Sequence, residues 1–176
     1  MTYVYEYELA AAFFMAVLYI FLKLQYSSQV LGNRLFQRLT FMAMLADGLD
    51  VVAALSIERF FDYPYWIVML INTIYFISTM VFGVYFVEYA YYLRYKERHI
   101  DFMYILSKLI ALAYIIMMLH NSVTGYVFSF DENGKYVHGS LYMLVYIIPF
   151  FYYLISVIST FHIFPRFTFK QKMSTI

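Results

Sequence analysis

Five long apolar stretches constrain this chain more than any other feature of its sequence. They occupy residues 9–25, 39–57, 65–92, 102–121 and 141–164. A helix of about 20 apolar residues crosses the hydrocarbon core of a bilayer. Because 64% of the 176 residues are hydrophobic and only 13% are charged, a water-soluble fold would leave large apolar patches exposed. The sequence therefore predicts an all-α integral membrane protein with five transmembrane helices, forming one membrane domain over residues 1–176.

The positions of the basic residues predict the direction of these helices. Nine of the twelve Lys and Arg residues flank the first connection, occupy the third, or follow the last apolar stretch. They are Lys23, Arg34, Arg38, Arg94, Lys96, Arg98, Arg166, Lys170 and Lys172. Short loops rich in Lys and Arg stay in the cytoplasm. We therefore expect a multi-pass protein of the cell membrane, with its N-terminus outside and its C-terminus in the cytoplasm.

The connection between the fourth and fifth stretches predicts an outer β-hairpin over about residues 126–138. Its aromatic and polar residues alternate around Asn-Gly at 133–134, which favours a two-residue turn because both residues adopt positive φ. In that register Phe130 lies opposite Val137 and shares with it and with Phe128 one apolar face. This face is expected to pack on the helix ends, as a lid over a ligand or as a plain cap.

Four ionisable residues fall at membrane depth, where charges are costly and often mark function. Asp47 and Asp50 lie three residues apart in the second stretch and share a helix face. Lys108 lies in the fourth stretch, and Glu88 lies near the cytoplasmic end of the third. The simplest arrangement pairs Lys108 with Asp47 or Asp50, with Glu88 as a further partner. Such a pair either fixes which helices are neighbours or switches its pairing with a ligand.

Polar residues near the outer helix ends and on the hairpin form the candidate binding site. A small ligand is predicted to bind a shallow pocket formed by Asn72, His120, Asn121, Asp131, Tyr136 and His138. Two histidines beside two acidic residues could also respond to pH. Their spacing matches no recognised metal motif, so no metal site is predicted.

Several classes of function lack the residues that they require. The chain has no cysteine, which excludes disulfides, thiol catalysis and thiolate metal sites. Its histidines lie at opposite membrane surfaces, so three cannot surround one zinc ion. No glycine-flanked nucleophilic serine, no phosphate-binding glycine loop and no basic face for nucleic acid is present. We expect neither catalysis by this chain, nor a cofactor, nor a nucleic-acid partner.

Three segments form a recognisable pattern. Residues 33–36 precede a helix with an internal acidic residue, and residues 72–76 read Asn-Thr-Ile-Tyr-Phe. In residues 121–139, an Asn precedes an aromatic Asp-x-x-Gly-x-Tyr hairpin and a closing Gly. The pattern resembles the N-terminal membrane module of bacterial GGDEF-type diguanylate cyclases and related sensor histidine kinases. The resemblance implies a sensory module, usually dimeric, that signals to a cytoplasmic output domain. Because that domain would follow Ile176, no cyclase or kinase chemistry is carried over.

The combined prediction is a sensor that passes a signal from the outer pocket, through the acidic residues and Lys108, to the cytoplasmic helix ends. The alternative is a small-solute transporter or its substrate-binding subunit, with Gly48 and Pro149 as the helix breaks that such proteins use. A structural partner for another membrane protein is a third possibility. Thr79 and Gly83 form a small-xxx-small pair suited to close helix packing or to a homodimer.

Overall fold

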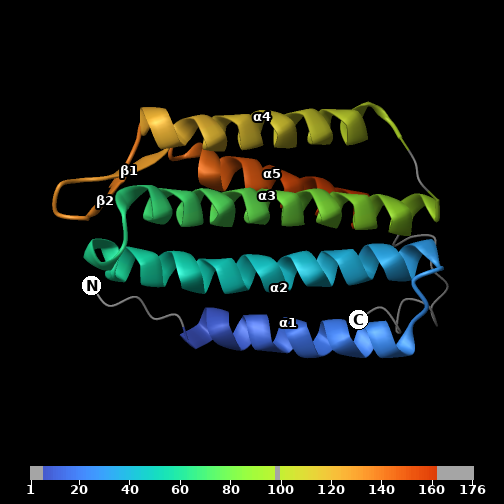
Figure 1. Ribbon diagram of the computed structural model, residues 1–176. Coiled ribbons are helices and arrows are strands. Elements are labelled where there is room, and N and C mark those ends of the chain that lie inside the picture. Colours follow the sequence, from blue (N-terminus) through green and yellow to red (C-terminus); the bar gives the residue numbers. More distant parts are fainter. Residues whose placement is uncertain (1–5, 98–99, 162–176) are drawn as a thin grey trace.

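The described part of the protein consists of five α-helices, one short 3-10 helix and one two-stranded sheet (Figure 1). The computed structural model describes residues 6–97 and 100–161. Its elements are α1 (Glu6–Gln25), α2 (Leu31–Glu58), the 3-10 helix η1 (Phe60–Asp62), α3 (Tyr65–Tyr95), α4 (Phe102–Thr124), β1 (Phe128–Phe130), β2 (Tyr136–His138) and α5 (Leu144–Phe161). α2 packs on α1 and α3, and α3 also packs on α4 and α5. α3 is therefore the central helix of the bundle.

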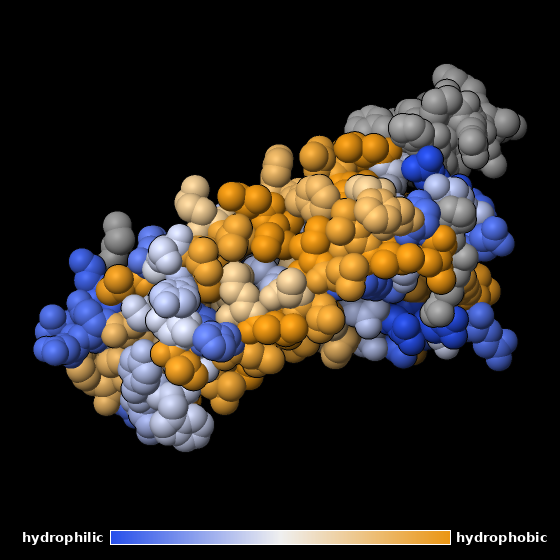
Figure 2. Space-filling view, turned by 90° about the horizontal axis from the view of Figure 1, so that it is seen from above, coloured by the Kyte–Doolittle hydropathy of each residue, from blue (hydrophilic) through white to orange (hydrophobic). Residues whose placement is uncertain are grey.

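The length and surface of the helices suit a membrane. α1, α2, α3 and α4 are each long and apolar enough to cross one, and α5 is a shorter apolar helix. Large hydrophobic side chains such as Phe13, Phe14 and Ile116 are exposed. Figure 2 shows hydrophobic residues across the middle of the molecule and hydrophilic ones towards its two ends. A mostly helical protein suited to a membrane is thus confirmed.

The helix boundaries differ from the predicted ones. α2 begins at Leu31 rather than at residue 39, because Gln37 is buried and donates to the carbonyls of Leu22 and Tyr26 at 3.1 and 3.0 Å. Backbone carbonyls at the end of α1 and just after it thus supply the hydrogen-bond acceptors for this buried polar side chain. α3 and α4 each continue for one turn, until a residue with positive φ ends the helix. These residues are Lys96 and Gly125.

The last helix also begins later than predicted. Residues 140–143 form turns, and α5 starts at Leu144. The Leu141 amide donates to the Tyr126 carbonyl at 2.8 Å, so the chain stays attached to the hairpin before the helix begins. Residues 162–164, predicted to complete this helix, lie outside the described residues.

A hairpin is present within the predicted residues, but the predicted two-residue turn is wrong. The side chain of Asp131 accepts hydrogen bonds from the amides of Asn133 and Lys135 at 2.9 and 2.8 Å. The Asp131 amide donates to the Lys135 carbonyl at 3.0 Å, and Gly134 has φ +71°. These bonds close a three-residue loop of the kind that ends with a left-handed glycine.

This loop shifts the strand register by one residue. Phe130 pairs with Tyr136 instead of Val137, and such a shift reverses the two faces of the second strand. Tyr136 therefore shares the buried face with Phe128, their rings stacked at 5.5 Å, while Val137 is 41% exposed. Phe128 also packs on Phe76 of α3, with ring centroids 5.4 Å apart. The hairpin thus covers the end of the bundle with aromatic rings.

Asn121, at the end of α4, fixes the hairpin in place. Its side chain is 1% exposed and accepts hydrogen bonds from the amides of Val127 and Phe128 at 2.7 and 3.3 Å. It also donates to the Phe128 carbonyl at 3.0 Å. One side chain therefore supplies the partners of three backbone groups in a buried connection.

Replacing Asn121 with alanine is expected to destabilise the protein by about 2 kcal/mol, because buried amides lose their acceptor. Amide hydrogen exchange across residues 126–138 should accelerate. Ser122→Ala is the control, since Ser122 is the next residue but is exposed. Equal exchange in the two variants would show that Asn121 does not hold the hairpin.

Candidate functional site

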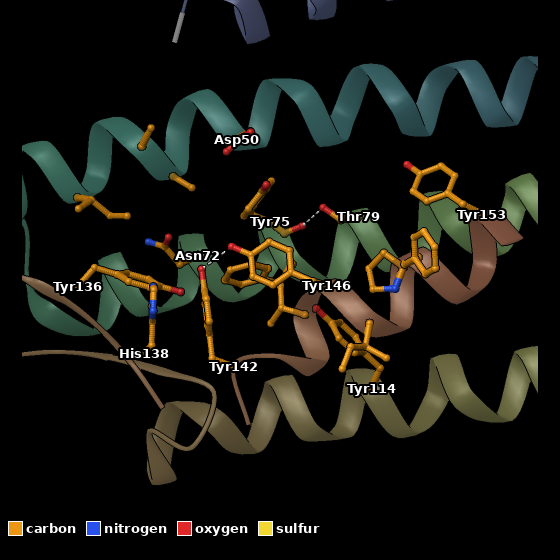
Figure 3. A pocket seen from close by; sticks show the side chains of 18 of the residues that line it. Asp50, Asn72, Tyr75, Thr79, Tyr114, Tyr136, His138, Tyr142, Tyr146 and Tyr153 are labelled. Atoms are coloured by element: carbon orange, nitrogen blue, oxygen red, sulfur yellow. Dashed lines mark hydrogen bonds between the residues drawn. The ribbon is translucent and has the colours of Figure 1, made fainter. Parts of the chain in front are cut away.

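A cleft of about 930 Å³ lies between α2, α3 and α5, beneath the hairpin (Figure 3). α2 and α5 each pack extensively on α3, but they do not pack extensively on each other within the described chain. A space therefore remains along one side of α3, with α2 and α5 as its walls. Its volume falls in the range of small-molecule binding sites.

Tyrosines dominate the lining of this cleft. They come from α3, α4, β2 and the segment that leads into and through α5, and are Tyr75, Tyr114, Tyr136, Tyr142, Tyr146 and Tyr153. The hydroxyls of Tyr142 and Tyr146 lie 2.9 Å apart, and the ring of His138 stacks on Tyr142 with centroids 3.7 Å apart. Tyrosine offers both an apolar ring and a polar tip. The lining is therefore amphipathic.

Two carboxylates also line the cleft. Asp50 and Glu58 both come from α2 and are eight residues apart, so Asp50 lies roughly 12 Å further along the helix axis. In Figure 3, Asp50 is on the α2 side of the cleft and faces the tyrosines of α3 and α5. No Lys or Arg is among the described residues that line the cleft. The charged part of the lining is thus acidic.

Three of the residues predicted to bind a ligand meet at this cleft. Asn72, Tyr136 and His138 all line it. Asn72 is 2% exposed and donates to the Val68 carbonyl at 2.9 Å and to the Ser56 hydroxyl at 3.3 Å. Asn72 therefore connects α3 to α2 while it forms part of the cleft wall.

The other three predicted residues lie outside the cleft lining. His120 is exposed near the end of α4, and the Asn121 side chain is fully engaged by the hairpin backbone. Asp131 is exposed and closes the hairpin loop. His120 has no described role, whereas Asn121 and Asp131 support the hairpin that covers the cleft.

The ion pair of Lys108 joins α4 to α3 and not to α2, so Glu88, the predicted further partner, takes the place of the two aspartates. Lys108 of α4 pairs with Glu88 of α3 at 2.7 Å, not with Asp47 or Asp50 of α2. The Tyr104 hydroxyl donates to the same Glu88 oxygen at 2.8 Å. The reason is the packing order, since α4 packs on α3 and is not an extensive neighbour of α2.

A metal centre is not built by the described residues. No group of three or more His, Cys, Asp or Glu side chains in residues 6–97 and 100–161 could hold a metal ion. Comparison with known proteins finds no family model, no curated protein and no solved structure that matches the chain. The residues of the cleft are what a proposed function has to explain.

Alkaline pH is expected to loosen the hairpin end of the cleft. Burial, and then the hydrogen bond with Tyr146, raises the pKa of Tyr142 to about 12, against an ordinary value of about 10. The stabilisation of the fold by protonated Tyr142 is therefore complete below about pH 10, and it is lost as the pH rises towards 12. Unfolding in detergent should become easier over that interval, and Tyr142→Phe should remove part of the pH dependence. An identical pH dependence in the two proteins would contradict this assignment.

Proposed function

We propose that this chain is a membrane-embedded sensory module, in which a ligand in the cleft alters the helix arrangement and signals to the cytoplasmic side. The observation that carries the proposal is the composition of the cleft. An occupant would touch Asp50 of α2, Tyr75 of α3, Tyr146 of α5 and His138 of the hairpin. A ligand with different affinities for two arrangements of these elements shifts the population between them.

The proposal includes five spanning helices, with the N-terminus outside and the C-terminus in the cytoplasm. Its support is the apolar length of α1 to α4 and the apolar sequence of the 18 described residues of α5. The connection of α1 to α2 and the end of α3 lie at one end of the bundle, opposite the hairpin (Figure 1). Five basic residues belong to that end: Lys23, Arg34, Arg38, Arg94 and Lys96. Positive loops of this kind stay in the cytoplasm, which puts the cleft in the outer half of the membrane.

α5 is the element best suited to carry the signal. Tyr146 and Tyr153 line the cleft, while Tyr152 packs against Gly83 of α3 and donates a hydrogen bond to the Ser107 carbonyl of α4. A Cβ added at Gly83 would lie 3.4 Å from Tyr152. Gly83 thus serves close helix packing within the chain. Because α5 touches both the cleft and its neighbours, a shift at one end changes contacts at the other.

The resemblance to the membrane module of diguanylate cyclases and sensor kinases agrees with this proposal. In such an arrangement, α5 would lead into a cytoplasmic output domain beyond Ile176, within a homodimer. The basic end of the bundle would face that domain. Any catalytic output would belong to that cytoplasmic domain, and the cleft would be the site where the signal is received.

A distance measurement tests the coupling. The chain has no cysteine, so the exposed Glu97 and Thr160 can be changed to cysteine and spin-labelled without background. Ala54→Trp then fills part of the cleft, because Ala54 lines it. Double electron–electron resonance spectroscopy of the labelled protein in nanodiscs should show that the distance between the two labels changes by about 2 Å, the size of common helix shifts. Ala113→Trp, on the exposed face of α4, is the control. A folded Ala54→Trp variant with an unchanged distance would contradict the sensory proposal.

A small-solute transporter, or its substrate-binding subunit, is the second candidate. Pro149 lies inside α5 and lines the cleft, and helix breaks at a binding site are typical of transporters. Solute flux into proteoliposomes would favour this function over sensing. Stoichiometric co-purification with a second membrane protein, without flux and without a distance change, would favour a structural partner.

A further inference from the structure

We infer that the cleft accepts an amphipathic organic cation, meaning a positively charged group on an apolar body. This inference rests on the proposed function, because it names the ligand class of the same cleft. Three properties of the lining lead to it: the sign of its charges, the density of its aromatic rings, and the absence of a metal-binding group among its described residues.

The charges of the lining favour a cation. Asp50 and Glu58 line the cleft, and no described Lys or Arg lines it with them. An anionic ligand would therefore meet charges of its own sign in a region of low dielectric constant, where such repulsion is strong. A cation meets opposite charges. Acidic residues at membrane depth serve as counter-ions for ligands in other membrane proteins.

The aromatic rings favour the same sign of charge. The faces of tyrosine and phenylalanine rings carry negative potential and attract cations within about 6 Å. Tyr146 and Tyr153 line the cleft and are 59% and 44% exposed, so their rings are accessible to a ligand. Phe150 lies between them in sequence and also lines the cleft. Carboxylates beside accessible rings form a setting typical of sites for organic cations.

The remaining lining requires an apolar body rather than a bare ion. Ala54, Ile57, Val145 and Ile147 supply only hydrocarbon surface. The volume of about 930 Å³ is much larger than an inorganic cation needs, and the described residues form no group that could hold a metal ion. Burial of apolar ligand surface against these side chains is favourable.

The lining also indicates how such a ligand would be oriented. Asp50 lies deeper along α2 than Glu58, roughly 12 Å from it along the helix axis. A cationic group beside Asp50 gains most from the low dielectric constant. The body then extends towards the hairpin, where the buried Tyr136 hydroxyl lies near that of Tyr142. A polar substituent at that end would have these hydroxyls as hydrogen-bond partners.

Two ions of matched shape test the sign preference. Tetraphenylphosphonium and tetraphenylborate are alike in size and shape but opposite in charge. Equilibrium dialysis against the protein in nanodiscs, with protein-free nanodiscs subtracted, should give at least about tenfold tighter binding of the cation, because the carboxylates attract it and repel the borate. Equal binding of both ions would mean an apolar groove filled by lipid chains. Either that result or tighter binding of the borate would overturn the inference.

Single substitutions then locate the bound cation. Asp50→Asn is expected to lower the affinity for tetraphenylphosphonium about tenfold, because the Coulomb attraction of one opposite charge is lost. Tyr146→Leu should lower it about threefold or more through the lost ring. Asp47→Asn is the matched control, since Asp47 is on the same helix but is not a lining residue. Unchanged affinity in both Asp50→Asn and Tyr146→Leu would overturn the inference. If Asp50→Asn fails to fold, unchanged affinity in Tyr146→Leu alone would overturn it.

The spin-labelled protein separates the failure of this inference from the failure of the proposed function. If tetraphenylphosphonium binds in the cleft but leaves the distance between residues 97 and 160 unchanged, and Ala54→Trp also leaves it unchanged, the ligand class stands and the sensory role is wrong. If Ala54→Trp changes that distance but neither ion prefers the protein, the sensory role stands and the ligand class is wrong.

Discussion

Replacing Gly139 with alanine is expected to separate the hairpin from the segment before α5 and to destabilise the protein by about 3 kcal/mol. A Cβ at this position would collide with the backbone of Tyr126 and would lie 2.6 Å from the Gly125 carbonyl oxygen. Backbone atoms cannot rotate away as a side-chain tip can. The added methyl group would therefore break the bond from the Gly139 amide to the Val127 carbonyl, now 2.9 Å long.

Gly48→Ala provides a matched control for this substitution. Gly48 lies within α2, and a Cβ there would meet nothing within 4 Å. Alanine should be neutral or should stabilise that helix by up to about 1 kcal/mol. Thermal unfolding in detergent and amide exchange of residues 126–140 would measure both effects. Similar behaviour of the two alanine variants would show that the contact at Gly139 is not restrictive.

The helices could be predicted because apolar length is a strong and local signal. The helix boundaries were harder to predict, because they depend on contacts with residues distant in sequence. Gln37 looked like a residue of a polar connection, but it lies inside α2 and is satisfied by the end of α1. A polar residue in a membrane helix needs such a partner, and the sequence does not reveal which one it has.

The hairpin shows how a local signal can give the right element and the wrong register. Asn-Gly at 133–134 correctly placed the loop, but Asp131 and Gly134 together permit a three-residue loop as well. What distinguishes the two is the face that becomes buried. The observed register buries Tyr136 beside Phe128, and this advantage depends on the bundle beneath the hairpin.

The candidate site was predictable only in part, for a related reason. Asn72, Tyr136 and His138 stood out as polar residues predicted to lie near the hairpin end of the bundle, and they do line the cleft. Tyr146 and Tyr153 were hidden within an apolar stretch that looked uniform. Seven residues separate them, which places them on one helix face, but the sequence does not show that this face meets a cleft instead of lipid.

Removing the positive charge of Lys108 is expected to cause the second large loss of stability, because Glu88 then lacks its cationic partner. The Glu88 and Lys108 side chains are 20% and 36% exposed in the protein, so the pair is half-buried. Breaking a fully buried pair costs about 3–5 kcal/mol, and we expect about 2–3 kcal/mol for Lys108→Met here. Lys96→Met, at an exposed position after α3, is the control. Unfolding in mixed detergent micelles would measure the difference.

The double variant Glu88→Leu/Lys108→Met decides what the pair does. It removes both charges, so its stability should return to within about 1 kcal/mol of the original protein. Simple addition of the two single effects would instead show that the ion pair itself contributes no coupling. The label distance between residues 97 and 160 gives the second readout. If the pair only fixes α3 beside α4, the stable double variant still responds to Ala54→Trp. If re-pairing of these charges transmits the signal, the double variant folds but that response disappears.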